Sequence, residues 1–213
     1  MKRPQTERLH VDGPAGALET LVESPVEPAG VAVICHPHPL YHGTMTNKVV
    51  HTLARAFNDT NFAAVRFNFR GVGDSEGKYD EATGETDDAL AVVSWARRRW
   101  PGMPLWLAGF SFGAFVALRA ATRELPAGLI SIAVPVQRFD VGTLEQPACP
   151  WIVVQGDHDE LVEADEIVAW IDSLEPGPEL VIMDGVDHFF HGHLRELRQR
   201  LYDLLQPHIT LKK

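Results

Sequence analysis

The segment Gly109–Gly113 places a serine between two glycines, in the pattern Gly-Phe-Ser-Phe-Gly. The apolar run Leu105–Ala108 precedes it, and the helix-like stretch Ala114–Ala121 follows it. A serine on such a sharp strand-to-helix turn is held in strained backbone geometry, and the glycines let strand and helix pass close together. The Ser111 hydroxyl would then stand at a helix N-terminus, where amide N–H groups favour developing negative charge. The pattern predicts a nucleophilic serine.

A serine hydroxyl is a weak nucleophile that needs a base, and the base needs a group that orients it. Two later loops, 155–162 and 184–190, each follow an apolar strand and carry such groups. Loops at the carboxyl ends of parallel strands meet at one edge of the sheet. We expect His188 to be the base, because His191 and His193 lie further from the strand end.

The acid that orients this histidine is predicted in the loop after Gly156. Asp159 lies three residues past that glycine, far enough around the turn to face the histidine loop. Asp157 is the alternative, although short acidic side chains at such positions more often brace a turn by accepting from backbone amides. Glu160 and Asp187 are expected to be solvated or to hold their loops. The chain order of serine, acid and histidine fits an open α/β sheet.

An oxyanion hole needs two N–H donors. The first is expected from the backbone of Phe112, immediately after the nucleophile. The second is expected from the loop 36–43, where the prolines have no N–H and leave His38 or Leu40. We favour His38, the second residue after His36 at the strand end.

Two other motifs have competing interpretations. His36, His38, His42 and His51 are near one another and could form a metal site, but no carboxylate shares their loop, so we predict neither metal nor cofactor. The glycine-rich loop 70–77 lacks the dinucleotide spacing and is expected to form the floor of the site.

The elements that position these residues alternate along the chain. Segments 6–11 and 17–23, separated by a turn rich in glycine and proline, predict an antiparallel hairpin. Apolar strands then alternate with amphipathic helices, which predicts an α/β fold with a mainly parallel sheet covered on both faces. The expected strands are 31–35, 63–69, 105–108, 129–134, 151–154 and 179–183; the expected helices begin near 46, 84, 114, 164 and 194. The connection 134–150 is too short for a cap domain. With 213 residues and 45% hydrophobic content, we expect one domain over residues 1–213.

Charge and composition exclude several classes of function. The formal net charge of −10 is unfavourable for nucleic acid and for anionic membranes. The basic cluster 97–99 is explained by the C-terminal end of a helix. The two cysteines, Cys35 and Cys149, are expected to be buried free thiols. Nothing resembles a signal peptide, so a cytoplasmic location is expected. The composition is compatible with a monomer or a homodimer.

Three of the motifs together resemble the α/β-hydrolase superfamily. They lie at residues 109–113, 156–159 and 187–190. The segments 36–39, 47–50 and 66–73 are more particular and are similar to small, lidless serine hydrolases near the dienelactone-hydrolase-like branch. The resemblance implies an eight-stranded sheet, a Ser111–Asp159–His188 triad, and amides of Phe112 and His38 as oxyanion donors. Dienelactone hydrolases themselves use cysteine as nucleophile, so the serine here departs from their pattern.

From these motifs and this resemblance, the expected function is hydrolysis of a carboxylic ester of a small or medium acyl group, through an acyl-enzyme on Ser111. The partner would be a small-molecule acyl substrate. The same machinery would also serve a thioesterase or a peptidase. A non-catalytic binding protein on this fold is the alternative from another class.

Overall fold

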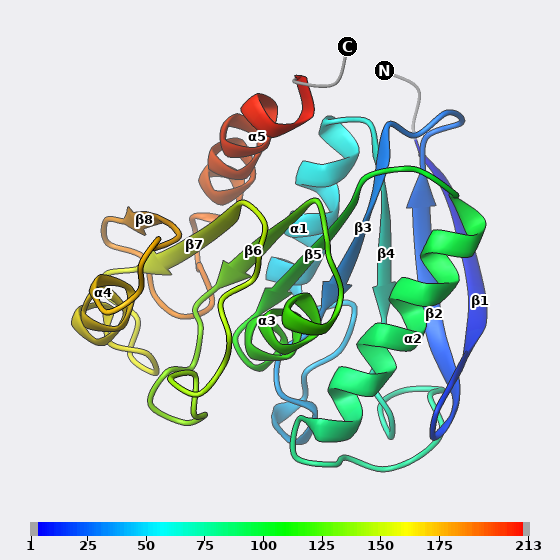
Figure 1. The fold of residues 1–213 in the computed structure, drawn as a ribbon, viewed down its shortest axis with the longest axis horizontal. Helices are drawn as coiled ribbons and strands as arrows, with labels where there is room; N and C mark the ends of the chain where they lie inside the picture. The colour runs from blue at the N-terminus through cyan, green and yellow to red at the C-terminus, as the bar shows by residue number, and fades with distance from the viewer. Residues whose placement is uncertain (1–3, 211–213) are drawn as a thin grey trace.

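The computed structural model describes residues 4–210 and contains an eight-stranded sheet in the order β1-β2-β4-β3-β5-β6-β7-β8 (Figure 1). The pairs β1–β2 and β2–β4 are antiparallel, and all the other neighbours are parallel. This confirms the mainly parallel sheet and its N-terminal hairpin. The strands are β1 (Gln5–Gly13), β2 (Gly16–Ser24), β3 (Gly30–Cys35), β4 (Phe62–Phe67), β5 (Leu105–Phe110), β6 (Gly128–Ile132), β7 (Trp151–Gly156) and β8 (Glu179–Met183).

Helices cover both faces of this sheet. In Figure 1, α2 and α3 lie in front of it and α1 lies behind it. The buried side chains form two clusters, one shared by the sheet with α2, α3 and α4 and the other shared with α1 and α5. The helices are α1 (Lys48–Asp59), α2 (Thr83–Arg99), α3 (Phe112–Arg123), α4 (Ala164–Asp172) and α5 (Leu194–Thr210), with a 3-10 turn η1 (Pro39–Tyr41) that the sequence did not indicate.

Strand β3 shows why the central strands have continuous apolar sequences. Val33 and Cys35 face the cluster of α2 and α3, whereas Ala32 and Ile34 between them face the cluster of α1 and α5. Successive side chains of a strand point to opposite faces, so a strand that is covered on both sides must be apolar at every position. All six residues of β3 are buried.

Within the described residues, the connection 133–150 between β6 and β7 contains turns and bends but no helix or strand. The expectation that no cap domain is inserted there is confirmed. In many folds of this layout the carboxyl ends of the strands form the ligand site, and here no inserted domain covers that edge.

The parallel register brings the six loops that follow β3 to β8 to this edge, among them the four that carry the candidate site residues. Cys35 at the end of β3 pairs with Gly109 of β5, and Gly156 at the end of β7 pairs with Met183 of β8. The loops that follow β3, β5, β7 and β8 therefore start side by side, with β6 between the two pairs of strands.

The loop 70–77 follows β4 at this edge but is bound to β2, and none of its residues lines the cavity at Ser111, which corrects the expectation that it forms the floor of the site. Ser75 Oγ accepts from Glu19 N at 2.9 Å, and Glu76 Oε2 accepts from Ala17 N at 2.7 Å, so the loop is tied to β2. At its start, Arg70 Nη2 is 2.7 Å from Asp88 Oδ1 in a buried ion pair with α2.

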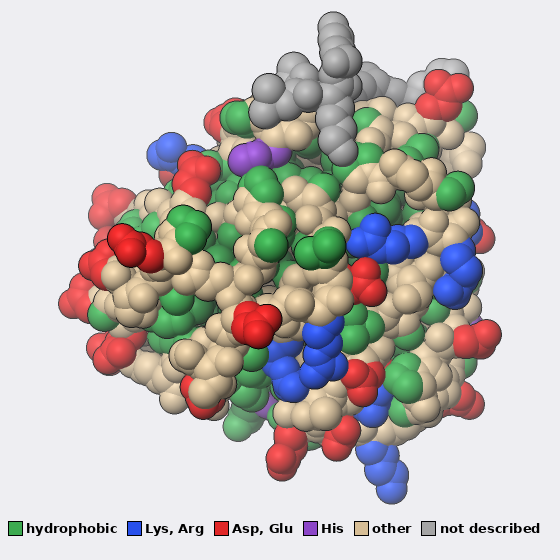
Figure 2. Space-filling model, in the orientation of Figure 1, with side chains coloured by type: hydrophobic (Ala, Val, Ile, Leu, Met, Phe, Trp, Pro, Cys, Tyr) green, Lys and Arg blue, Asp and Glu red, His purple; other side chains and the backbone are tan. Residues whose placement is uncertain are grey.

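Figure 2 shows acidic side chains gathered at the edge of the molecule that carries α4 and β8, whereas basic side chains lie over the middle of this face. Arg97, Arg98 and Arg99 form the exposed last turn of α2, as expected for a solvated helix end. In residues 4–210, no helix is long and apolar enough to cross a bilayer.

Candidate active site

Ser111 occupies the turn between β5 and α3 in a strained conformation. Its φ of 54° and ψ of −121° lie in a region that residues with a side chain rarely adopt. Its N–H donates to Ile132 O at 2.8 Å, and its carbonyl accepts from Ala114 N at 2.8 Å. A conformation of this kind costs about 1–3 kcal/mol and persists only where the surroundings impose it. The strand register and the start of α3 hold Ser111 in this conformation.

The two flanking glycines are required by close backbone approach. A Cβ atom on Gly113 would overlap the carbonyl oxygens of Cys35 and His36, at the end of the neighbouring strand β3. A Cβ on Gly109 would overlap the backbone of Gly113. The sequence pattern is therefore explained by the packing of α3 against β3 and β5.

His188 and Asp159 are in direct contact. His188 Nδ1 lies 2.8 Å from Asp159 Oδ2, and both side chains are buried. The imidazole packs against Phe110 and Phe189, with ring centroids 5.1 and 5.0 Å away. Its backbone N–H donates to Glu160 Oε2 at 3.3 Å. The ring is thus fixed on two sides, and with Nδ1 donating to the carboxylate, the lone pair of the neutral ring lies on Nε2.

The Asp159 carboxylate is held in its charged form by hydrogen bonds. Burial alone would raise its pKa, but the contact with His188 and the N–H groups of Leu161 and Val162 outweigh this and bring the pKa below its usual value. Both N–H groups donate to Oδ1 at 2.8 Å, and Gln155 Nε2 donates to Oδ2 at 3.0 Å. A charged acceptor at this position suits the stabilisation of a nearby imidazolium.

The other acidic residues of these loops contact backbone or surface groups. Asp157 is exposed, and its Oδ1 accepts from Gly185 N at 2.6 Å, which braces the two loops against each other. Asp187 pairs with His191 at 2.8 Å, and His193 lies 3.3 Å from Glu196. Of these contacts between an acid and a histidine, the one between Asp159 and His188 is buried, whereas the one between Asp187 and His191 is exposed.

The loop after β3 presents backbone N–H groups near Ser111. Leu40 N donates to His38 Nδ1 at 3.2 Å, so this amide already has an acceptor. Within residues 4–210, the amides of His38 and Phe112 have no hydrogen-bond acceptor. His38 and Phe112 line the same cavity as Ser111, and N–H groups without an acceptor are what a tetrahedral oxyanion requires there. This geometry favours His38 over Leu40.

The histidines of this loop are engaged in structural contacts. His36 is fully buried; its Nδ1 donates to Pro37 O at 2.6 Å and its Nε2 accepts from Phe69 N at 3.0 Å. Burial lowers the pKa of His36 to about 4. His38 Nε2 lies 3.2 Å from Tyr79 Oη. The described residues contain no group of three or more His, Cys, Asp or Glu side chains that could hold a metal ion.

Ser111 and His188 line the same cavity, which has a volume of about 430 Å3. Its walls are largely apolar and aromatic, and its polar side chains come from the loops after β3, β5, β6 and β8. The lining residues are Pro37, His38, Tyr41, His42, Gly43, Asn47, Ser111, Phe112, Pro135, Arg138, Phe139, Leu161, His188 and Phe189. A concave site of this size fits a small molecule.

Sequence reasoning missed three contributors to this site: Gln155, Tyr79 and Arg138. Gln155 is the penultimate residue of β7, and its amide supports the Asp159 carboxylate from within the sheet. Tyr79 is distant from His38 along the chain. A polar residue inside the otherwise apolar run of β7 was the one local signal that could have been used.

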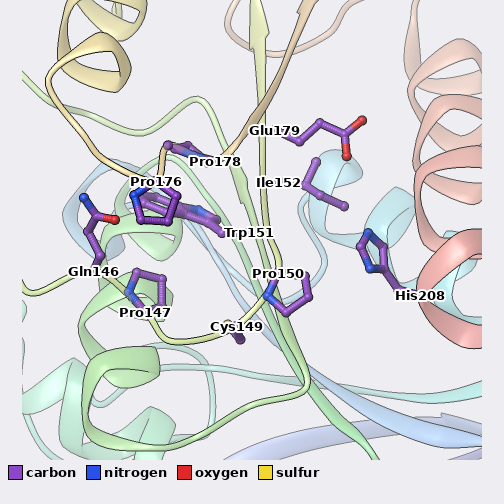
Figure 3. Close-up of a pocket in the computed structure, with 11 residues that line it drawn as sticks. Gln146, Pro147, Cys149, Pro150, Trp151, Ile152, Pro176, Pro178, Glu179 and His208 are labelled. Atoms are coloured by element: carbon purple, nitrogen blue, oxygen red, sulfur yellow. The ribbon is translucent and has the colours of Figure 1, made fainter. Parts of the chain in front are cut away.

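A second cavity of about 260 Å3 opens near the start of β7 and β8, away from the carboxyl ends of the strands (Figure 3). Prolines and Gln146 line one side, and Glu179 and His208 line the other. Cys149 lies here and is only half-buried, which corrects the expectation that both thiols are buried. Burial raises the pKa of Cys149 to about 11, so its thiol is protonated at neutral pH and is a poor nucleophile.

Comparison with known families agrees with this site. A family model described as serine aminopeptidase, S33 matches residues 27–138, more than half of the chain. The chain belongs to this family of α/β hydrolases. An uncharacterised protein of Rickettsia prowazekii is 34% identical over 93% of this chain and 88% of its own length.

Two solved structures share both sequence and fold with this hydrolase. An α/β serine hydrolase without a lid from Xanthomonas campestris is 42% identical with a TM-score of 0.92, over 98% of this chain and 97% of its own. An α/β serine hydrolase homologue from Coxiella burnetii is 45% identical with a TM-score of 0.90, over 93% and 97%. The resemblance to lidless α/β hydrolases noted in the sequence is confirmed.

Proposed function

We propose that this hydrolase cleaves carboxylic esters of small or medium acyl groups through an acyl-enzyme on Ser111. The observation that carries the proposal is the shared cavity. A strained serine at a helix N-terminus and a histidine held 2.8 Å from a buried carboxylate both line it.

In the proposed first half-reaction, the Ser111 Oγ–H proton passes to His188 Nε2 while Oγ forms a bond to the ester carbonyl carbon. The resulting oxyanion accepts hydrogen bonds from the N–H groups of Phe112 and His38. Asp159 keeps the proton of the imidazole on Nδ1 and stabilises the imidazolium. When the intermediate collapses, the bond from carbon to the alcohol oxygen breaks, and the alcohol leaves with the proton from His188 Nε2.

In the second half-reaction a water molecule takes the place of the alcohol. His188 Nε2 accepts a proton from this water as its oxygen bonds to the acyl carbon. Collapse then breaks the bond to Ser111 Oγ, which recovers the proton, and the carboxylic acid leaves. Each removed oxyanion donor in such sites typically costs about 10²–10³ in kcat.

The proposed preference for small or medium acyl groups rests on the volume of the cavity and on the absence, in residues 4–210, of a cap domain over it. About 430 Å3 is at the low end for ligand sites. No cap domain adds apolar surface above it, so a long chain would extend into water. We expect kcat/KM to be highest for short acyl groups in a series of 4-nitrophenyl esters. A strong preference for long chains would contradict this expectation.

Cleavage of a peptide at a free N-terminus, which the family description suggests, is less well supported. Recognition of an ammonium group calls for a carboxylate near the reacting serine. Among the described residues that line the cavity there is no Asp or Glu, and the fixed charge is that of Arg138. An ester or thioester is the better match.

The test is the intact mass of the protein after exposure to a fluorophosphonate, with Ser111→Ala as the control. This probe requires an activated serine and no guess at the substrate. We expect a single adduct on the natural protein and none on the variant. No adduct on folded protein would mean an unactivated or unreachable hydroxyl, and the alternative of a non-catalytic binding protein would then be favoured.

A further inference from the structure

The cavity beside Ser111 is lined by a positively charged side chain, although the protein has a formal net charge of −10. Arg138, from the loop after β6, lines it and is exposed. Within residues 4–210, no carboxylate lies within ion-pair distance of its guanidinium, and its side chain has no hydrogen-bond partner. Its cationic side chain therefore remains available to a ligand.

The carboxylates closest to the reacting groups point elsewhere. Asp159 accepts from the imidazole of His188, and Glu160 accepts from the backbone N–H of the same residue. Neither of these two carboxylates lines the cavity. An anionic ligand would therefore meet one cation and no anion among the described lining residues.

The segment that carries Arg138 is held in place by its neighbours. The N–H groups of Arg138 and Phe139 both donate to Pro135 O, at 3.0 and 3.2 Å, which closes a turn. The Phe139 ring stacks on Phe115 of α3 at 4.6 Å between centroids and contacts Phe112 at 5.6 Å. Phe112 is the residue after the nucleophile, so the turn is anchored to the nucleophile's own helix.

The positive charge of Arg138 affects the pKa of His38, which lies in the loop after β3. The pKa of His38 is lowered by burial first and by the positive charge of Arg138 second. His38 is therefore neutral at pH 7, and the fixed positive charge of the cavity is that of Arg138. The rest of the lining is mostly aromatic and apolar.

We propose that Arg138 selects esters that carry a carboxylate, so that the preferred substrate is an anionic ester rather than a neutral one. This inference rests on the proposed ester hydrolysis at Ser111. The guanidinium can bind a carboxylate through two parallel N–H donors, a geometry that lysine cannot reproduce. The charged group belongs either to the acyl part or to the alcohol part of the ester.

The test compares charged esters with neutral isosteres. For the acyl side, the 4-nitrophenyl monoester of glutarate is compared with that of glutaramate. For the alcohol side, the acetate ester of 3-hydroxybenzoate is compared with that of 3-hydroxybenzamide. In each pair kcat/KM is measured after subtraction of spontaneous hydrolysis, and the ratio of charged to neutral ester is the readout.

The variants are Arg138→Gln, Arg138→Lys and a control, Arg98→Gln. Arg98 is also exposed and lacks an ion-pair partner among the described residues, but it lies in the last turn of α2 outside the cavity. We expect the natural protein to prefer the charged ester in one of the two pairs. Arg138→Gln should lower that ratio about tenfold, equivalent to about 1.4 kcal/mol. Arg138→Lys should retain part of it, and Arg98→Gln should leave it unchanged.

Salt provides an independent readout. The preference should shrink between about 0.1 and 1 M salt, since the Debye length falls from about 10 to 3 Å. If the natural protein hydrolyses the neutral esters without preferring either charged one, the inference is overturned while the proposed function stands. A preference that survives in Arg138→Gln also overturns it. If no ester is hydrolysed and no fluorophosphonate adduct forms, the proposed function fails and the inference fails with it.

Discussion

Replacing Asp159 by asparagine tests the proposed acid most directly, because the structure dictates how the amide must sit. Only donors face the carboxylate: Leu161 N and Val162 N point at Oδ1, while Gln155 Nε2 and His188 Nδ1 point at Oδ2. The new NH2 group must face one of these pairs. Leu161 N and Val162 N are fixed backbone donors, and the Gln155 amide is held by its further hydrogen bonds from Nε2 to Gly156 O and Val162 O. The imidazole can become an acceptor by moving its proton to the other ring nitrogen.

We therefore expect the NH2 group of Asp159→Asn to face His188 and to shift the imidazole proton from Nδ1 to Nε2. The ring then has no lone pair for the Ser111 proton. Loss of the correct tautomer in such a triad lowers kcat about 10⁴-fold, or about 5.5 kcal/mol. The weakened buried hydrogen bonds should also reduce the free energy of unfolding by about 1–3 kcal/mol.

The matched control is Asp157→Asn, two residues away in the same loop. Asp157 is exposed, and an asparagine Oδ1 can still accept from Gly185 N. We expect kcat to change less than about twofold and stability to fall by less than about 1 kcal/mol. The measurements are kcat on a short 4-nitrophenyl ester and thermal unfolding of both variants. If Asp157→Asn abolishes activity and Asp159→Asn does not, the assignment of the acid is wrong.

Three further outcomes follow from the backbone and from a buried ring. Ser111→Gly should unfold at higher temperature than Ser111→Ala, because glycine relieves about 1 kcal/mol or more of strain at φ 54°; equal melting temperatures would argue against stored strain. Gly113→Ala should destabilise the fold by about 2–3 kcal/mol in denaturant unfolding, and a neutral effect would contradict the close approach to β3. Because the pKa of His36 is about 4 when folded and about 6.5 when unfolded, the unfolded state binds more protons between these values. Stability should thus fall by about 2 kcal/mol from pH 7.5 to 5, and the fall should be smaller in His36→Gln.

The sequence predicted those features that depend on local pattern. The turn is specified by Gly109–Gly113, whose residues are adjacent in the chain. The strands could be predicted because a strand that is buried on both faces has a continuous apolar sequence. The contact between His188 and Asp159 also agrees with the sequence-based prediction, since both residues follow their strands at the expected distance.

Features that depend on distant partners could not be predicted. The loop 70–77 was misplaced because its partners, Ala17 and Glu19, lie more than fifty residues away along the chain. Arg138 gave no local signal, since an arginine in a loop is ordinarily solvated. Its position at the cavity depends on Phe139, which anchors the turn on α3. The choice between His38 and Leu40 depends on a side-chain contact, His38 Nδ1 with Leu40 N, that only the folded turn creates.

The order of the strands divides the site into parts of unequal local stability. The proposed nucleophile and oxyanion donors follow β5 and β3, which are central and fully buried. The histidine follows β8, an edge strand of five residues with one of them buried. Edge elements open with less free energy than central ones. We therefore expect mild denaturant to release the histidine loop first, so that activity is lost while the central strands still protect their amides from hydrogen exchange.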